Sequence, residues 1–136
     1  MIHFNTVSSL HNEAIIKLYK SVNWTNYTNR SGILLKGIQN SLYILGAFKE
    51  DKLIGLIRII GDGYTIIYIQ DLLVHPNYQQ KGIGQKLVDK ILNQYNSVRQ
   101  IVLLADTNEI LDNFYQKVGF KTVNTLGLTC HARLNS

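Results

Sequence analysis

The sequence has one cysteine, one proline and no apolar run approaching the roughly 20 residues that span a bilayer. With Cys130 alone, neither an intrachain disulfide nor a cluster of cysteine ligands for zinc can form. The N-terminal residues also lack the basic segment and apolar core of a secretory signal. We therefore expect a cytoplasmic protein that binds no metal and no membrane.

Positive charge is in modest excess. The 136 residues carry a formal net charge of +5, which permits an anionic ligand. The chain has neither a basic recognition helix nor a basic strand studded with aromatic side chains, so we expect no nucleic-acid partner. Independent domains most often have about 100–150 residues, and the length therefore suits one domain spanning residues 1–136.

The first third of the chain predicts a strand and two helices. Residues 2–7 have the pattern of a strand, and residues 11–22 have apolar side chains at helical spacing. Residues 23–30 are rich in Asn and Thr, which favours turns over a regular element. Ser31 is a candidate cap for a second helix that runs through residue 39.

The middle of the chain predicts an antiparallel meander followed by a helix. Residues 42–49, 53–60 and 64–74 are apolar runs joined by short turns, the second of which contains Asp62-Gly63. Residues 82–95 follow as a helix with a single apolar stripe.

The last third predicts a crossover and the end of the sheet. Residues 101–105 form a short apolar strand after a helix, so we expect this strand to lie parallel to the one before that helix. Asp106 and Glu109 resemble a capping box that opens a helix reaching Val118. Two final strands close the predicted sheet: residues 120–124 and 126–134.

Gly82 and Gly84 stand in the first turn of the predicted helix. Backbone N–H groups there are unpaired and lie at the positive end of the helix dipole, so they can bind phosphate oxygens. Glycine lets such a ligand approach closely, although a purely structural turn is the alternative. Two common nucleotide motifs are absent, because Leu87 replaces the third small residue of the dinucleotide fingerprint and no Gly-Lys-Ser or Gly-Lys-Thr loop occurs.

Two segments carry a more specific pattern. Residues 79–84, QQKGIG, resemble the acyl-CoA signature of the GNAT superfamily of N-acetyltransferases: Gln or Arg, two variable residues, Gly, one variable residue, then Gly or Ala. Residues 108–120, NEILDNFYQKVGF, resemble that superfamily's N-x-x-A-x-x-F-Y-x-x-x-G-F segment, with Leu111 in place of the alanine. The two segments occur in the family's order.

The resemblance implies a fold and an activity. The fold is mixed α+β: a single GNAT-like domain with a mostly antiparallel twisted sheet of six to seven strands, about four helices, and strands 4 and 5 parallel and splayed. The activity is transfer of the acetyl group of acetyl-CoA to a primary amine of an unidentified small molecule or peptide, by direct attack in a ternary complex. A non-catalytic module that binds or senses acyl-CoA is the alternative.

The same resemblance assigns the cofactor-binding residues. The pyrophosphate lies on the backbone of the glycine turn, which comprises Gln79, Gln80, Lys81, Gly82, Ile83 and Gly84. Pantetheine pairs like an extra strand with Leu72, Leu73 and Val74, and an amide near Leu73 or Val74 polarises the thioester carbonyl. Asn108 hydrogen-bonds the pantetheine arm.

Tyr115 is the general acid by resemblance. It would protonate the departing CoA thiolate, and it lies seven residues after Asn108, so both side chains share one face of a helix. Without the motif, an aromatic residue on the buried face of a helix is the simpler interpretation.

The general base has several candidates. Asp71 lies in an apolar strand, where a carboxylate is costly unless it is paired or reached by water. It is either the base or a structural carboxylate bonded to neighbouring backbone or to Arg58. Gln70, expected on the opposite face of the strand, could instead orient a water, and His75 is a further candidate.

Trp24 and Tyr27 are candidates for the acceptor pocket. An amine-bearing substrate gains from an apolar or cation–π wall, although plain packing explains Trp24 equally well. The sequence does not identify the acceptor. A homodimer through the C-terminal strands is common in the family and is a further expectation from the resemblance.

Overall fold

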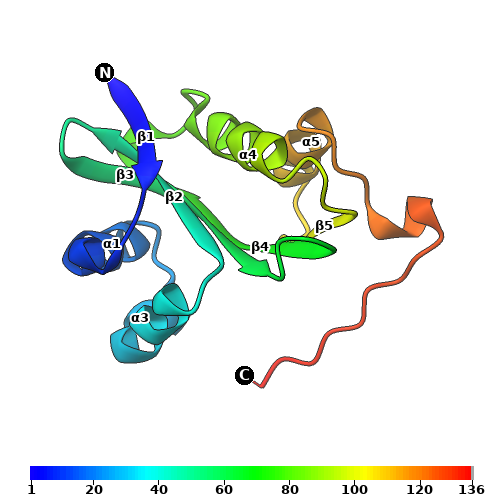
Figure 1. The fold of residues 1–136 in the computed structure, drawn as a ribbon, viewed down its shortest axis with the longest axis horizontal. Coiled ribbons are helices and arrows are strands. Elements are labelled where there is room, and N and C mark those ends of the chain that lie inside the picture. Colours follow the sequence, from blue (N-terminus) through cyan, green and yellow to red (C-terminus); the bar gives the residue numbers. More distant parts are fainter. Residues whose placement is uncertain (136) are drawn as a thin grey trace. The chain divides into compact units, whose positions relative to one another are not determined.

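A five-stranded sheet in the order β1-β2-β3-β4-β5 dominates the computed structural model (Figure 1). The structure describes residues 1–135, which fall into two compact units: Met1–Leu104, and a second unit that begins at Ala105. The first unit holds all five strands: β1 (Ile2–Thr6), β2 (Tyr43–Lys49), β3 (Lys52–Gly61), β4 (Ile66–Val74) and β5 (Gln100–Leu103). The assignment of residues 1–136 to a single domain stays a prediction.

Strand pairing follows the predicted meander. β1 through β4 pair antiparallel, and β4 pairs parallel with β5, as predicted from the intervening helix. Asp62 holds the turn between β3 and β4, because its Oδ1 accepts the N–H groups of Tyr64 and Thr65, each at 2.8 Å. A hydrogen bond from the hydroxyl of Thr65 and these backbone N–H groups lower the pKa of Asp62.

β4 is irregular at Gln70 and has a partner along only half of one edge. Arg58 pairs with Asp71 while Ile59 pairs with Ile69, so Gln70 is an extra residue that bulges from β4. On the other edge, pairing with β5 ends where Ile69 meets Leu103. Residues 70–74 therefore have no β5 partner.

Helices cover both faces of this sheet. They are α1 (Asn12–Ser21), α2 (Thr25–Thr28), α3 (Ser31–Gln39) and α4 (Ile83–Gln94). α4 lies on one face, whereas α1 and α3 lie on the other (Figure 1). No helix among residues 1–135 has the length and apolarity needed to cross a membrane.

The helix stripes that face the sheet form the core. Leu87, Val88 and Ile91 of α4 are completely buried, as is Ile15 of α1. Burying each such aliphatic side chain contributes about 1.5–3 kcal/mol. This packing holds a layer of helices on each face of the sheet, so β4 lies between two helical layers.

Two details of the N-terminal helices differ from expectation. Residues 23–30 contain the one-turn helix α2 rather than turns alone, and Trp24 and Tyr27 pack against the core cluster. This packing compensates for the weak helix propensity of Asn and Thr. Ser31 is the first residue of α3 rather than its cap, a position that Arg30 occupies without a side-chain hydrogen bond.

The second unit contains α5 (Glu109–Lys117) and a 3-10 helix (Val123–Leu126). Asn108 caps α5, not Asp106, because its Oδ1 accepts the N–H groups of Ile110 at 2.8 Å and Leu111 at 3.3 Å. The prediction of two strands here was wrong. Residues 120–124 and 126–134 form no strand in the structure.

The strand pattern failed because alternating side chains do not supply a partner edge, and a strand requires one. Gly127, in the left-handed region with a φ of 74°, also turns the chain between the two predicted strands. The described fold therefore has five strands instead of six to seven, and five α-helices instead of about four.

Candidate active site

His75 and Gln79 fix the turn that leads from β4 to α4. His75 Nδ1 accepts the N–H of Asn77 at 3.1 Å and so caps the 3-10 helix Pro76–Tyr78. Gln79 Nε2 donates to the carbonyl oxygen of Val74 at 3.0 Å. Both side chains thus hold the backbone of the turn in place. As a base, His75 would need the lone pair of Nδ1, which already accepts the N–H of Asn77.

The next three residues present unpaired backbone donors. Among residues 1–135, no group accepts the N–H of Gln80, Lys81 or Gly82. Gln80 and Gly82 have positive φ angles of 62° and 82°. The first turn of α4 adds further free N–H groups and the positive end of the helix dipole.

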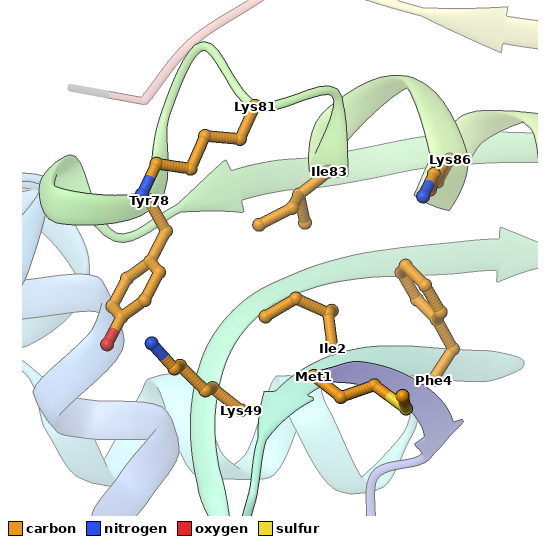
Figure 2. A pocket seen from close by; sticks show the side chains of 8 residues that line it. All are labelled: Met1, Ile2, Phe4, Lys49, Tyr78, Lys81, Ile83 and Lys86. Carbon is orange, nitrogen blue, oxygen red and sulfur yellow. The ribbon is translucent and has the colours of Figure 1, made fainter.

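The space in front of Gly82 is open. A Cβ atom built on Gly82 would meet no atom within 4 Å. The side chain of Lys81 is turned back toward Tyr78 and does not fill that space (Figure 2). Free donors beside open space suit a phosphate oxygen, so the turn fits the pyrophosphate of an acyl-CoA.

The end of β4 offers a second set of donors. The N–H of His75 donates to the carbonyl of Ile54 on β3 at 2.8 Å. Peptide N–H groups alternate between the two edges of a strand, so the N–H of Val74 points to the opposite edge, as does that of Leu72. That edge has no β5 partner and suits an extended ligand such as pantetheine.

A cleft of about 380 Å³ adjoins this strand end. Leu72, Leu73 and Val74 line one side, and Trp24 and Gln79 also line it. The structure therefore brings together the strand predicted to bind pantetheine, the start of the glycine turn and one of the two predicted acceptor residues.

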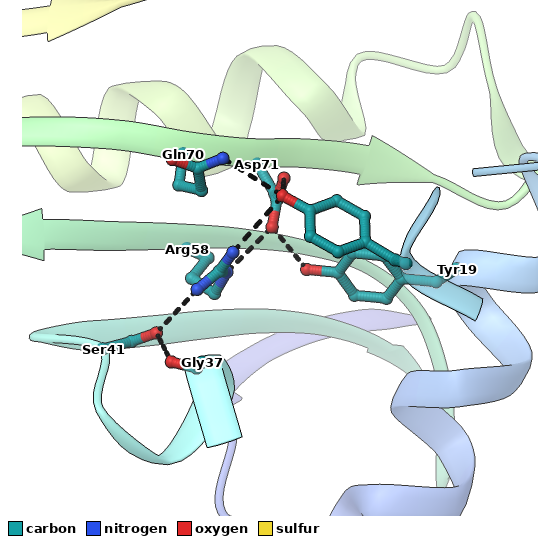
Figure 3. A network of polar contacts seen from close by, with 7 residues as sticks. Tyr19, Gly37, Ser41, Arg58, Gln70 and Asp71 are labelled. Atoms are coloured by element: carbon teal, nitrogen blue, oxygen red, sulfur yellow. Dashed lines mark hydrogen bonds and ion pairs between the residues drawn. The ribbon is translucent and has the colours of Figure 1, made fainter. Parts of the chain in front are cut away.

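Asp71 lies beside this cleft at the centre of a buried polar network (Figure 3). The residue is only 4% exposed. Its Oδ2 accepts the hydroxyl of Tyr19 and the Nε–H of Arg58, each at 2.8 Å, and its Oδ1 accepts the hydroxyl of Tyr27 at 2.8 Å. This arrangement corresponds to the structural carboxylate bonded to Arg58 that the sequence offered as one interpretation.

Tyr27 extends the network to Gln70. The Tyr27 hydroxyl oxygen accepts Gln70 Nε2 at 3.1 Å and Arg58 Nη2 at 3.4 Å. The expectation that Gln70 and Asp71 reach opposite faces was wrong, since both contact this hydroxyl. The β4 bulge is the cause, because an extra residue interrupts the alternation of side chains.

Arg58 also joins the network to α3. Its Nη1 donates to Ser41 Oγ at 3.3 Å, and that hydroxyl donates to the carbonyl of Gly37 at 2.8 Å. One ion pair thus connects two strands with helices α1, α2 and α3. The helical wall of the cleft is anchored to β4 through hydrogen bonds to a charged group.

The pKa values of the network residues follow from burial and from the charge on Asp71. Burial, followed by the Asp71 charge, raises the pKa of both Tyr19 and Tyr27. Burial by itself lowers the pKa of Arg58, but the charge and hydrogen bond of Asp71 outweigh it, so the net shift is upward. Both phenols stay protonated and Arg58 stays charged at neutral pH.

Trp24 is held by the aromatic rings of the network. Its ring centroid lies 5.9 Å from that of Tyr19, in an edge-to-face arrangement, and 6.2 Å from that of Tyr27. Tyr19 and Tyr27 are themselves edge to face at 5.2 Å. The position of Trp24 in the cleft therefore depends on the two phenols that bind Asp71.

Asn108 and Tyr115 lie in the second unit. The capping bonds occupy Asn108 Oδ1, and its Nδ2 has no acceptor among residues 1–135. Tyr115 is half-buried, with Phe114 and Phe120 edge to face at 5.1 and 5.9 Å. Burial raises the pKa of Tyr115, so its hydroxyl stays protonated at neutral pH.

Known proteins are similar to this chain in sequence and in fold. The model of the Acetyltransferase (GNAT) family matches residues 12–120. The chain belongs to the GNAT family. An uncharacterized N-acetyltransferase (ycf52-like) of Prochlorococcus marinus is 32% identical to this GNAT chain over 133 residues, which cover 93% of this chain and 71% of that protein.

Solved GNAT structures resemble the described fold. A GNAT family acetyltransferase of Streptococcus pneumoniae TIGR4 is 32% identical, with a TM-score of 0.88 that covers 99% of this chain and 98% of the other. AAC(6')-Iy, solved with the bisubstrate analog CoA-S-monomethyl-acetylneamine, has a TM-score of 0.75 with 100% and 99% covered. At 15% identity, this second likeness shows the fold alone.

Sequence reasoning missed Tyr19 and Ser41 as members of the polar network. Tyr19 lies on the apolar face of the predicted first helix, where only its phenolic oxygen indicates a need for a buried partner. Arg58 gave a clearer signal, because a charged residue in an apolar strand opposite a strand that contains Asp71 predicts an ion pair.

Proposed function

We propose that this chain is an acetyl-CoA-dependent N-acetyltransferase that transfers the acetyl group to a primary amine by direct attack in a ternary complex. One observation carries the proposal: the unpaired donors of Gln80, Lys81 and Gly82 lie on the turn that follows the free edge of β4. A polyanionic headgroup followed by an extended amide-bearing arm matches this order of donors. Acetyl-CoA use is also typical of the family.

The acyl donor would bind along these backbone groups. The pyrophosphate would lie on the turn from Gln79 to Gly84, and pantetheine would pair with residues 72–74. Of the donors Gln79 contributes least, because its N–H is directed to the carbonyl of Pro76 at 3.4 Å. Gln79 is better suited to holding the turn, through its side-chain bond to Val74.

Val74 would polarise the thioester carbonyl. Its N–H points to the free edge of β4, whereas the N–H of Leu73 has the orientation that faces β3. A preorganised donor aimed at a developing oxyanion is typically worth about 2.7–4 kcal/mol of barrier lowering. Between the two amides suggested by the resemblance, we therefore favour Val74.

Tyr115 would act as the general acid and Asn108 would bind the pantetheine arm, both by the family pattern. The raised pKa of Tyr115 keeps its proton available at neutral pH. When the carbon–sulfur bond breaks, the phenol would donate that proton to the thiolate. The free Nδ2 of Asn108 could donate to a pantetheine carbonyl while Oδ1 continues to cap α5.

Asp71 would position the cleft wall and leave the amine proton to solvent. Its three hydrogen-bond donors all belong to the buried network, and Asp71 is not among the residues that line the cleft where the amine would lie. The ammonium proton would pass to water at the open cleft before attack. Direct proton removal by Asp71 is the competing proposal.

The acceptor would lie against Trp24. Its ring lines the cleft beside Leu72 to Val74, and an aromatic face attracts an ammonium group. Tyr27 would support Trp24 instead of contacting the acceptor, because its hydroxyl donates to Asp71. Cytoplasmic location, the absence of metal, nucleic-acid and membrane partners, and a homodimer belong to the same proposal.

A thiol-release assay tests the activity. Purified protein with acetyl-CoA and a panel of primary amines should release free CoA thiol at a rate that depends on the amine. Isothermal titration with acetyl-CoA is run in parallel. Acetyl-CoA binding without thiol release for any amine would favour the non-catalytic binding module, and no binding would refute the donor site.

A further inference from the structure

A second cavity lies on the α4 side of the sheet, away from the cleft that Trp24 lines. It encloses about 230 Å³ between β1, the end of β2 and the first turn of α4 (Figure 2). Ile2 and Phe4 of β1 and Ile83 of α4 form an apolar floor. The first unit alone supplies its lining residues.

Lysine side chains form the rim of this cavity. Lys49 and Lys81 line the cavity, and their ammonium nitrogens each lie 5.6 Å from the centroid of the Tyr78 ring. The ammonium nitrogen of Lys52, which does not line the cavity, lies 5.7 Å from the same centroid. Lys86 also lines the cavity. Three ammonium groups around one ring repel one another. A cation–π contact at an exposed site stabilises the protein by only about 0.5–1 kcal/mol.

No carboxylate neutralises these lysines. Among residues 1–135, the one ion pair is that of Arg58 with Asp71. Glu50 and Asp51 occupy the turn beside Lys49, and Asp89 lies in α4, yet none of the three forms an ion pair there. Among the described residues, the rim lysines therefore have no ion-pair partner, and they lie beside an apolar floor.

We propose that this cavity binds a small organic phosphate as a second ligand site, separate from the acyl-donor site. A phosphate dianion compensates several ammonium groups at once, which a single carboxylate does less well. The volume and the apolar floor suit a ligand whose phosphate carries a compact apolar group. Such a ligand places the phosphate on Lys49, Lys81 and Lys86 and its apolar part on Phe4.

The two sites use different groups of the same turn. The proposed donor site uses backbone N–H groups of Gln80 to Gly84 and the free edge of β4. The cavity uses the side chains of Lys81 and Ile83. Because both sites include Lys81 and Ile83, we expect ligand in the cavity to change acetyl-CoA affinity, and this coupling alone rests on the proposed function.

Phenyl phosphate serves as the probe. Phenol, which carries only its apolar part, and inorganic phosphate, which carries only its charged part, are the control ligands. Isothermal titration at low salt should show phenyl phosphate binding more tightly than either control ligand. In the double variant Lys49→Gln/Lys86→Gln, affinity should fall at least tenfold, since each lost charge costs about fivefold. Lys36→Gln, on the exposed surface of α3, is the matched control and should bind like the parent protein.

Coenzyme A distinguishes a second site from part of the donor site. With acetyl-CoA saturating, phenyl phosphate should still bind, and the double variant should keep its thiol-release rate without the probe. Unchanged probe affinity in the double variant would overturn the proposal. It would also be overturned if coenzyme A competed with the probe and lost affinity equally in the double variant. The two overturning outcomes are measured by binding alone, so they do not depend on whether acetyl transfer occurs.

Discussion

Arg58 Nε lies 2.8 Å from Asp71 Oδ2, and the two side chains are only 6% and 3% exposed. The pair joins adjacent strands at the bulge of β4. Two phenols complete the coordination of the carboxylate. The charge on Asp71 is thus compensated inside the protein and anchors the wall of the cleft.

Replacing Arg58 should destabilise the fold strongly. Arg58→Met leaves the Asp71 carboxylate buried without its counter-charge, and breaking such a pair costs about 3–5 kcal/mol. Urea unfolding at neutral pH measures the change. Arg99→Met removes an exposed arginine and should stay within about 0.5 kcal/mol of the parent protein. Equal stability of the two variants would contradict a structural role for the ion pair.

Tyr19→Phe should change how stability depends on alkaline pH. Loss of a hydrogen bond to a charged acceptor costs about 1.5–3 kcal/mol at pH 7. Because folding raises the pKa of Tyr19, its contribution is complete below the ordinary tyrosine pKa of about 10 and is lost as pH rises above it. Denaturant unfolding between pH 7 and 11 should show a shallower decline in the variant.

Tyr64→Phe is the control for that series. Tyr64 is 84% exposed, so its replacement should alter neither the stability at pH 7 nor the alkaline slope. If the Tyr19 and Tyr64 variants declined in parallel, the coupling between Tyr19 and Asp71 would be disproved.

Asp71→Asn separates positioning from proton removal. With Asp71 as a positioning residue, the variant should have a higher KM for the amine because Trp24 loses its support, while the acidic limb of the pH–rate profile stays in place. A base would instead show a loss of about 10²–10⁴-fold in kcat together with the disappearance of that limb. Rates across pH 5–9 decide between the two, and we expect the first.

Gly82→Ala should impair donor binding. Gly82 has a φ of 82°, so alanine there costs roughly 1–2 kcal/mol of backbone strain, and its methyl group enters the space proposed for the pyrophosphate. We expect the Kd for acetyl-CoA to rise about tenfold or more in isothermal titration. Gly32→Ala in α3 should instead stabilise the protein by about 0.5–1 kcal/mol and leave this Kd unchanged.

Tyr115→Phe should reduce turnover without changing donor affinity. Removal of a general acid typically costs about 10²–10⁴-fold in kcat, whereas the phenylalanine ring keeps the packing against Phe114 and Phe120. Steady-state thiol release and acetyl-CoA titration measure the two effects separately. An unaltered kcat would remove Tyr115 from the mechanism.

Turn chemistry and apolar periodicity predicted most of the first unit. The Asp62-Gly63 turn and the runs on either side of it indicated the β3–β4 hairpin, and the crossover through α4 indicated the parallel pairing of β5. The hairpin turn depends on residues close together in the sequence, and the parallel pairing follows from the single helix between the two strands. The motif at residues 79–84 likewise predicted the position of the turn with free backbone donors.

The sequence offered Arg58 as a partner of Asp71, but the register that pairs them depends on a bulge that the pattern does not encode. The register set by Gly61 and Ile67 would place Arg58 opposite Gln70, and the bulge moves its partner to Asp71. A one-residue insertion in a strand leaves the apolar pattern nearly unchanged. The role of Tyr19 was also unreadable, because its hydrogen bond joins residues 52 positions apart.

The same separations give the buried network an order of assembly. Arg58 and Asp71 are 13 residues apart within one hairpin, whereas Tyr19 and Asp71 are 52 apart. A fourfold longer loop costs about 1.2 kcal/mol more chain entropy to close. We therefore expect the hairpin to pair its two charges before α1 docks, so that α1 would pack onto an ion pair whose charges already compensate each other.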